Sequence, residues 1–158
     1  MISIEDIVET VNKTLPLNSM WDGLWVHKFK RKNLVIGASF DRCYYRDYDI
    51  VFKKVSFFNL PYQWRDTEVN SENLIRLSTK KEFEKQHPDF DILDKNIFAI
   101  DIWLTNYARE NIMHTFFVIA QTVYIFKQLP PDNNFGGAEY TDPFIGEVFP
   151  CKKNRVTK

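Results

Sequence analysis

The sequence predicts an α+β fold: a mainly antiparallel, twisted sheet of five or six strands, with an N-terminal helix on one face and a short charged helix inserted. Several runs alternate apolar and polar side chains, as half-buried strands do. Aromatic residues, which favour strands, make up 16% of the chain. Near the N-terminus, apolar residues repeat at helical spacing instead. We expect residues 1–150 to form one domain and 151–158 to form a frayed basic tail.

Residues 4–14 are predicted to form an amphipathic helix. Ser3 followed by Asp6 resembles a capping box, with Asp in place of the usual Glu or Gln. Pro16 should end the helix, because proline cannot continue it. The apolar residues that would face the sheet are Ile4, Ile7, Val8, Val11 and Leu15.

Three strands are predicted next, over 24–30, 33–40 and 48–60. Short links join them, which favours an antiparallel meander. The second strand alternates most clearly, with Leu34 and Ile36 on one face and Val35 on the other. Its pattern is typical of a strand that is buried on one side.

The alternation changes phase within the third strand. If a period of two continues unbroken, Ile50 and Phe52 lie on one face, and Val55 lies on the other. The change falls at the adjacent pair 53–54, which are both lysines. A β-bulge there would restore the phase, whereas a central strand buried on both faces would need none. Both interpretations stay open, and Pro61 should end the strand.

The polar segment 67–95 is predicted to be an insertion within the same domain. It should hold a short strand near Leu74 and a charged helix that starts after Thr79, where Glu82 completes a second capping-box pattern. Two longer strands follow, over 96–107 and 113–127, and should pair as a hairpin. The second is apolar on both faces, which favours a central position in the sheet. Beyond Leu129 we expect an irregular tail.

Charge and composition restrict the function. The chain has 21 basic and 21 acidic residues, without the basic excess of typical nucleic-acid-binding proteins, so we do not expect a nucleic-acid partner. No signal peptide and no run of about 18 apolar residues occurs, which predicts a cytoplasmic protein without a membrane span. Cys43 and Cys151 lack metal-site spacing and should stay as thiols. We expect no cofactor and no metal.

No catalytic motif is present, so no catalytic residue is assigned. One alternative is a small-molecule-binding or enzymatic domain, in which side chains of the first strand and of the later hairpin meet across the sheet. The spacing of its histidines is not that of a metal site. That pocket would consist of Trp25, His27, Asp101, Trp103 and His114.

Two loops that mix aromatic and charged side chains are the preferred binding candidates. Tyr, Trp and Arg are the residue types that dominate interface hot spots. A structural role, in which the rings cover the ends of the sheet, stays open. We interpret the basic stretch 28–32 as a solvated hairpin tip, and nucleic-acid binding through this tip is a third hypothesis. The candidate partner-binding residues are Tyr44, Tyr45, Arg46, Tyr48, Tyr62, Trp64, Arg65 and Asp66.

The first 66 residues resemble a known group of proteins. A helix is followed by Trp21-Asp22 before a strand, then by a hairpin, and then by the pattern I-x-F-x-x-V-x-F-x-x-L-P from Ile50 to Pro61. This order is similar to that of small, aromatic-rich α+β proteins of bacteria, some of which are regarded as immunity proteins of polymorphic toxin systems. The resemblance implies a non-enzymatic protein-binding role, with a toxin as the partner, and identifies no binding residues. A homodimer is also compatible with the sequence.

Overall fold

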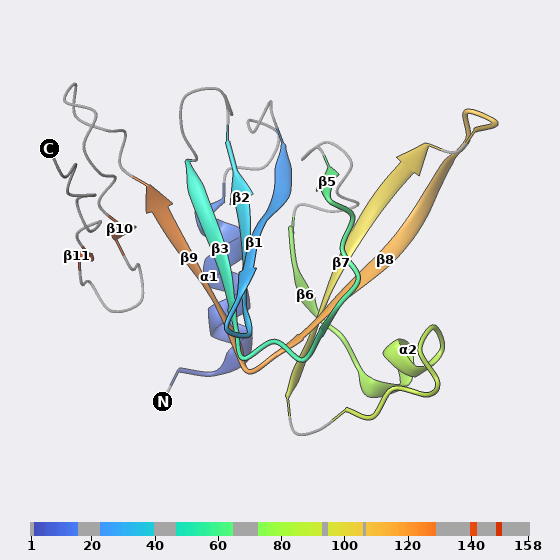
Figure 1. Cartoon of the computed structure of the whole chain (residues 1–158), viewed down its shortest axis with the longest axis horizontal. Coiled ribbons are helices and arrows are strands. Elements are labelled where there is room, and N and C mark those ends of the chain that lie inside the picture. The colour runs from blue at the N-terminus through green and yellow to red at the C-terminus, as the bar shows by residue number, and fades with distance from the viewer. Residues whose placement is uncertain are drawn as a thin grey trace, which may run out of the picture.

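The protein is described by a computed structural model that covers residues 2–15, 23–39, 47–64, 73–92, 95–105, 107–128, 140–141 and 148–149. Within these residues the chain forms two antiparallel sheets and two helices, which confirms the α+β class. The expectation of one sheet of five or six strands is wrong. In Figure 1 the two sheets meet at their lower ends and diverge upwards.

Sheet A has seven strands in the described part of the chain, and sheet B has four. In spatial order, sheet A contains β5 (Gln63–Trp64), β1 (Leu24–Lys30), β2 (Asn33–Ala38), β3 (Tyr48–Lys53), β9 (Thr122–Gln128), β10 (Tyr140–Thr141) and β11 (Val148–Phe149). Sheet B contains β4 (Phe57–Phe58), β8 (Asn111–Ala120), β7 (Asn96–Thr105) and β6 (Arg76–Leu77). The predicted meander of β1, β2 and β3 is confirmed, as is the hairpin of β7 and β8.

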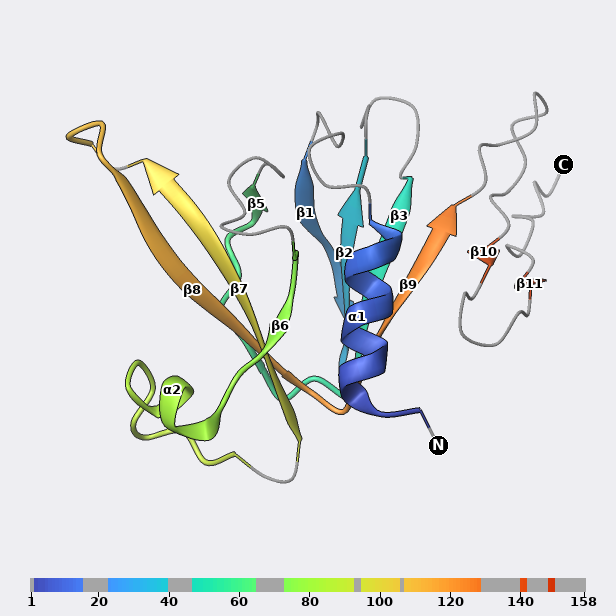
Figure 2. The same ribbon diagram turned by 180° about the vertical axis from the view of Figure 1, so that it is seen from behind.

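Helix α1 (Ile4–Thr14) packs against sheet A, in front of it in Figure 2. The predicted capping box is present: Ser3 Oγ accepts a hydrogen bond from the Asp6 backbone N–H, and the Asp6 carboxylate accepts one from the Ser3 N–H. Asn12 makes two hydrogen bonds between the helix and the backbone of Ile75. Its amide donates to the Ile75 carbonyl at 2.8 Å and accepts from the Ile75 N–H at 3.1 Å. The helix is therefore joined to the segment that leads into β6.

Of the places where the chain crosses between the sheets, two are neighbours in space. The phase change at Lys53 and Lys54 marks the first: β3 ends at Lys53, Lys54 has a φ of 51°, and the chain continues into β4 of sheet B. The predicted single strand over 113–127 is wrong, because it breaks at Gln121 into β8 of sheet B and β9 of sheet A. The Gln121 N–H donates to the Lys53 carbonyl at 2.9 Å. This hydrogen bond joins the two crossings.

The inner faces of both sheets and the apolar face of α1 share the main core. Leu34, Ile36, Ile50 and Phe52 of sheet A are fully buried there. From sheet B the core includes Phe98, Ile100, Ile102, Val118 and Ala120. A second cluster lies on the outer face of sheet B, beneath α2 (Lys80–Glu84). No helix in the described segments is long and apolar enough to cross a membrane.

Candidate binding surface

Three of the eight predicted partner-binding residues lie in the described part of the chain, and two of them are buried. Residues 44–46, 65 and 66 lie outside the described part of the chain. Tyr48 and Trp64 are core residues, with Trp64 only 2% exposed. The buried Nε1 of Trp64 finds no hydrogen-bond acceptor among the described residues. Among these three described residues, only Tyr62, at 70% exposure, is available to a partner.

The alternative pocket is not assembled either. Trp25 and His27 lie in β1 of sheet A, whereas the other three residues lie in sheet B. Within sheet B, Asp101 is opposite Thr115 and His114 is opposite Ile102. Since neighbouring residues of a strand point to opposite faces, Asp101 and His114 lie on different sides of the sheet. No cluster of His, Cys, Asp or Glu in the described segments could hold a metal ion.

One feature that the sequence did not predict is an exposed arm formed by the outer half of the β7–β8 hairpin. We define the arm as residues 103–105 and 111–113, beyond the fully buried Ile102. In the described segments, the strands that pair with this hairpin lie at its base, where β6 pairs at Ala99 and Phe98 and β4 pairs at Ile119 and Val118. The outer half extends beyond them as a two-stranded ribbon, at the upper right of Figure 1. No other strand of the described segments pairs with it.

The arm carries large apolar side chains on both faces. On the outer face, Trp103 is opposite Met113, and they are 39% and 44% exposed. On the other face, Leu104 is opposite Ile112, which is 42% exposed. Tyr107, in the connecting turn, is fully exposed. Large apolar side chains that gather on one exposed element are typical of interaction sites.

The free edge of β8 is also open to strand addition. Residues 111–116 have no charged side chain and no proline, and their register with β7 has no bulge. Charged residues, prolines and bulges are the usual protections of an edge strand against pairing with another chain. Because these protections are missing, this edge can accept an extended segment of a partner.

A hydrogen-bonded ion pair network holds the base of the arm. Arg76 of β6 donates two hydrogen bonds to the Asp101 carboxylate, at 2.7 and 3.1 Å, and two to the Glu82 carboxylate of α2, at 2.9 and 2.6 Å. Thr115 of β8 donates to Asp101 at 2.6 Å, and Ser78 donates to Glu82. Bidentate pairs of this kind combine strength with fixed geometry. Asp101 is therefore structural in this arrangement, although it interrupts an apolar strand.

The network keeps all three groups charged. Hydrogen bonds from Arg76 lower the pKa of Glu82 to about 2, against the opposing effect of burial. Burial acts to raise the pKa of Asp101, but the hydrogen bonds from Arg76 and Thr115 outweigh it, so that this pKa is lowered. The hydrogen bonds to Glu82 and Asp101 raise the pKa of Arg76. A proton donor or acceptor for catalysis would need a pKa nearer neutrality.

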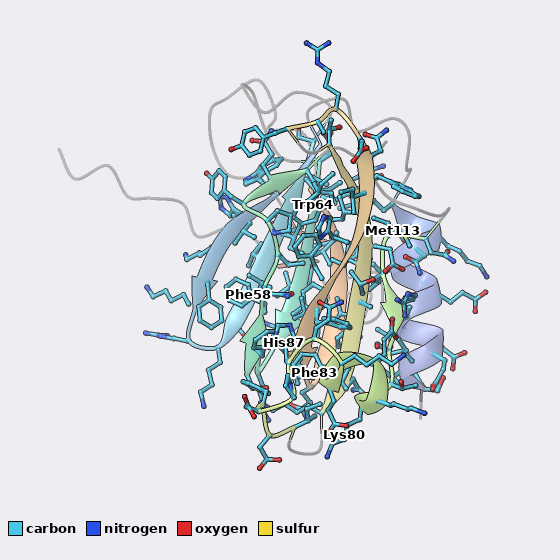
Figure 3. All side chains as sticks on the ribbon, turned by 90° about the vertical axis from the view of Figure 1, so that its right-hand side faces the viewer. Phe58, Trp64, Lys80, Phe83, His87 and Met113 are labelled. Atoms are coloured by element: carbon cyan, nitrogen blue, oxygen red, sulfur yellow. The ribbon has the colours of Figure 1, made fainter. Side chains whose placement is uncertain are left out.

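The second aromatic cluster supports the hairpin below this network. Phe83 of α2 is fully buried and makes an edge contact with Phe117 of β8, with ring centroids 5.2 Å apart. His87 packs against Phe83, and its Nε2 lies 3.3 Å from the Asn59 amide nitrogen. Figure 3 shows Phe83 and His87 over the lower part of sheet B, with Met113 far above them. Neither α2 nor this cluster reaches the arm.

Comparison with known proteins found no matching family model, no matching curated protein and no matching solved structure. The class that the coordinates define is an α+β protein of two antiparallel sheets. A binding site in this protein is therefore inferred from the geometry of its own residues.

Proposed function

We propose that this protein is a protein-binding domain and that its binding surface is the β7–β8 arm. The observation that carries the proposal is the exposure of Trp103, Met113 and Ile112 on a ribbon with an uncharged free edge. Tryptophan is strongly enriched in interface hot spots. A two-stranded ribbon that projects beyond the rest of its sheet is also marginal by itself and gains from further pairing.

The mode of binding that fits the arm is strand addition. An extended segment of the partner adds to the free edge of β8, and its main chain supplies the hydrogen bonds. Its side chains then lie beside Met113 on one face and Ile112 on the other, because side chains alternate along a strand. We propose a partner with apolar side chains on both faces of that segment.

The partner class that we propose is a toxin. It comes from the resemblance of residues 1–66 to bacterial proteins of which some are regarded as immunity proteins. In that role the arm would bind the toxin and block its activity without chemistry by this chain.

Co-expression with the proteins encoded beside its gene tests the proposal. We expect one of them to copurify with the wild-type chain, and the double variant Trp103→Thr/Met113→Thr to weaken the complex at least about tenfold, since hot-spot truncations cost about 2 kcal/mol or more. Ile2→Thr, at an exposed apolar residue before α1, is the matched control and should bind normally.

A third variant tests whether the partner binds the arm or the loop surface that the sequence predicts as the binding site. Tyr62→Thr should leave binding unchanged if the arm is the site. If Tyr62→Thr abolishes the complex while the arm variant retains it, the arm is not the binding surface. If no neighbouring product is retained or neutralised, the toxin-binding role loses its support.

A further inference from the structure

A basic hollow lies on the outer face of sheet A, remote in the fold from the β7–β8 arm. Its volume is about 320 Å³. Two valines, Val35 and Val51, form an apolar floor, and four cations and an amide surround them. The polar lining residues are Lys28, Lys30, Arg31, Asn33 and Lys53.

The strand register explains why these side chains gather. Lys28 is opposite Val35, Val35 is opposite Val51, and Val51 is opposite Tyr124, so that one row crosses four strands on one face. Lys30 and Lys53 lie two residues away along their strands and share this face, because side chains alternate with a period of two. In Figure 1 the β1–β2 turn and the end of β3 meet at the lower end of sheet A.

The cations of the hollow are not neutralised by the described part of the chain. Residues 23–39 contain no Asp or Glu. No ion pair in the described segments involves any of the four lining cations. The nearest acid on the same face is Asp49, which is buried opposite Gly37. The positive potential of the hollow is therefore available to a ligand.

The backbone at this end of the sheet is unfavourable for the residues it carries. Arg31 and Lys32 form a two-residue turn with φ values of 51° and 60°, and Lys54 has a φ of 51°. Such turns strongly favour Asn-Gly, because both central residues need a positive φ. Here cations occupy a backbone conformation that is unfavourable for residues other than glycine and asparagine. The placement of charged residues at such positions supports a function for the charge.

Two aromatic side chains of β9 lie on the same face of sheet A, next to the valine floor. Tyr124 closes the row, and Phe126 lies two residues further along β9, with the ring centroids 6.4 Å apart. Both rings are partly exposed. Cations that bind phosphates, next to aromatic rings that stack on bases, are the common design of sheets that bind single-stranded nucleic acid.

We propose that the outer face of sheet A binds single-stranded nucleic acid, with phosphates at Lys28, Lys30, Arg31 and Lys53 and a base on Tyr124. The balanced net charge of the chain does not exclude a local basic surface. An anionic membrane is the competing ligand, but a bilayer is flat, and the cations here line a concavity. The proposal is independent of the protein-binding role of the arm.

Fluorescence anisotropy with a labelled 12-nucleotide oligo(dT) over a series of salt concentrations tests this inference. We expect roughly micromolar affinity at low salt, falling steeply as salt rises. Lys28→Gln/Lys30→Gln/Lys53→Gln should weaken binding at least about tenfold and reduce the salt slope by about 2, since each phosphate contact contributes about 0.7. The matched control Lys80→Gln/Lys81→Gln/Lys85→Gln removes the same charge from α2 and the residue after it, and should bind like the wild type.

Two further variants exclude trivial explanations. Arg31→Asn/Lys32→Gly gives the turn its preferred residues, so we expect a higher thermal midpoint together with weaker oligonucleotide binding. Loss of binding in a more stable protein cannot result from unfolding. Tyr124→Leu should weaken binding at least about fivefold with an unchanged salt slope, because stacking releases no counterions.

Three results would overturn the inference. The first is that wild-type protein fails to bind the oligonucleotide at low salt. The second is equal binding by the hollow variant and the α2 control. The third is flotation with phosphatidylserine vesicles without any oligonucleotide binding, which would assign the hollow to a membrane.

Discussion

The two halves of the β7–β8 hairpin have similar composition and opposite surroundings. At the base, both faces are buried: Phe98 and Val118 lie in the main core, and Ala99 and Phe117 lie in the second aromatic cluster. In the arm, the same alternation continues, but Trp103, Ile112 and Met113 stay 39–44% exposed, and no further strand of the described segments pairs with the ribbon. The two halves of the hairpin therefore differ in the elements that pack against them and not in the composition of their strands.

We therefore expect the base of the hairpin to contribute to stability and the arm to contribute to binding. Apolar residues at the base stabilise the fold, since each fully buried side chain contributes about 1.5–3 kcal/mol. The exposed apolar residues of the arm gain only part of this energy in the isolated protein. The rest becomes available only when another polypeptide covers them. The three predictions that follow test this division.

The largest expected effect is at the base. Phe83→Ala removes a fully buried ring that touches Phe57, Phe90 and Phe117. We expect a loss of about 3–5 kcal/mol in the free energy of unfolding, measured by urea denaturation, because the cavity cannot collapse within packed rings. Phe29→Ala removes the same side chain from a half-exposed position and should cost less than half as much. Equal losses would contradict the division.

A smaller effect should come from acid. The folded pKa of Glu82 is about 2 and its ordinary value is 4.5, so its contribution is present above pH 4.5 and is lost as the pH falls towards 2. The lowered pKa of Asp101 acts in the same direction. After a discount for solvent screening, we expect about 1–2 kcal/mol of destabilisation from Glu82.

The measurement is the free energy of unfolding from pH 6 to pH 2. Glu82→Gln should be less stable than the wild type at pH 6 and should show a flatter decline with acid. Glu9→Gln removes an acid from an exposed pair with Lys13 on α1 and serves as the control. If Glu82→Gln and the wild type decline in parallel, the network does not stabilise the base of the arm.

The smallest effect on stability should come from the arm itself. Trp103→Thr/Met113→Thr should change the free energy of unfolding by less than about 1 kcal/mol, since exposed substitutions rarely cost more. Thermal denaturation followed by circular dichroism measures this. A loss above about 2 kcal/mol would show that the arm is covered within the folded protein, and it would then be no free surface.

Local patterns in the sequence predict the elements correctly wherever short-range physics decides them. Helix α1 follows from the spacing of Val8 and Val11 and from its capping box. The meander follows from clean alternation and short turns. Even the phase change at Lys53 and Lys54 is real, but it marks a crossing between sheets and neither of the two alternatives considered.

Pairing between distant strands could not be predicted. The run that contains Gln121 is apolar on both sides of this residue, and no proline or glycine divides it between two sheets. Its alternation does shift by one, from Val118 and Ala120 to Val123 and Ile125, all of which face the main core. The proposed pocket failed for the same reason, because β1 and β7 belong to different sheets. Which aromatic residues turn inward, as Trp64 does, depends on that topology.

We expect the adjacent crossings to favour one order of folding. Strand β9 pairs with β3, and the chain between Lys53 and Gln121 contains every described strand of sheet B together with β5. Closing so long a loop before its interior is ordered loses much chain entropy without local compensation. The β7–β8 hairpin is joined by a short turn and can form early. We therefore expect sheet B to form first, because its formation shortens the loop that must close before β9 can pair with β3.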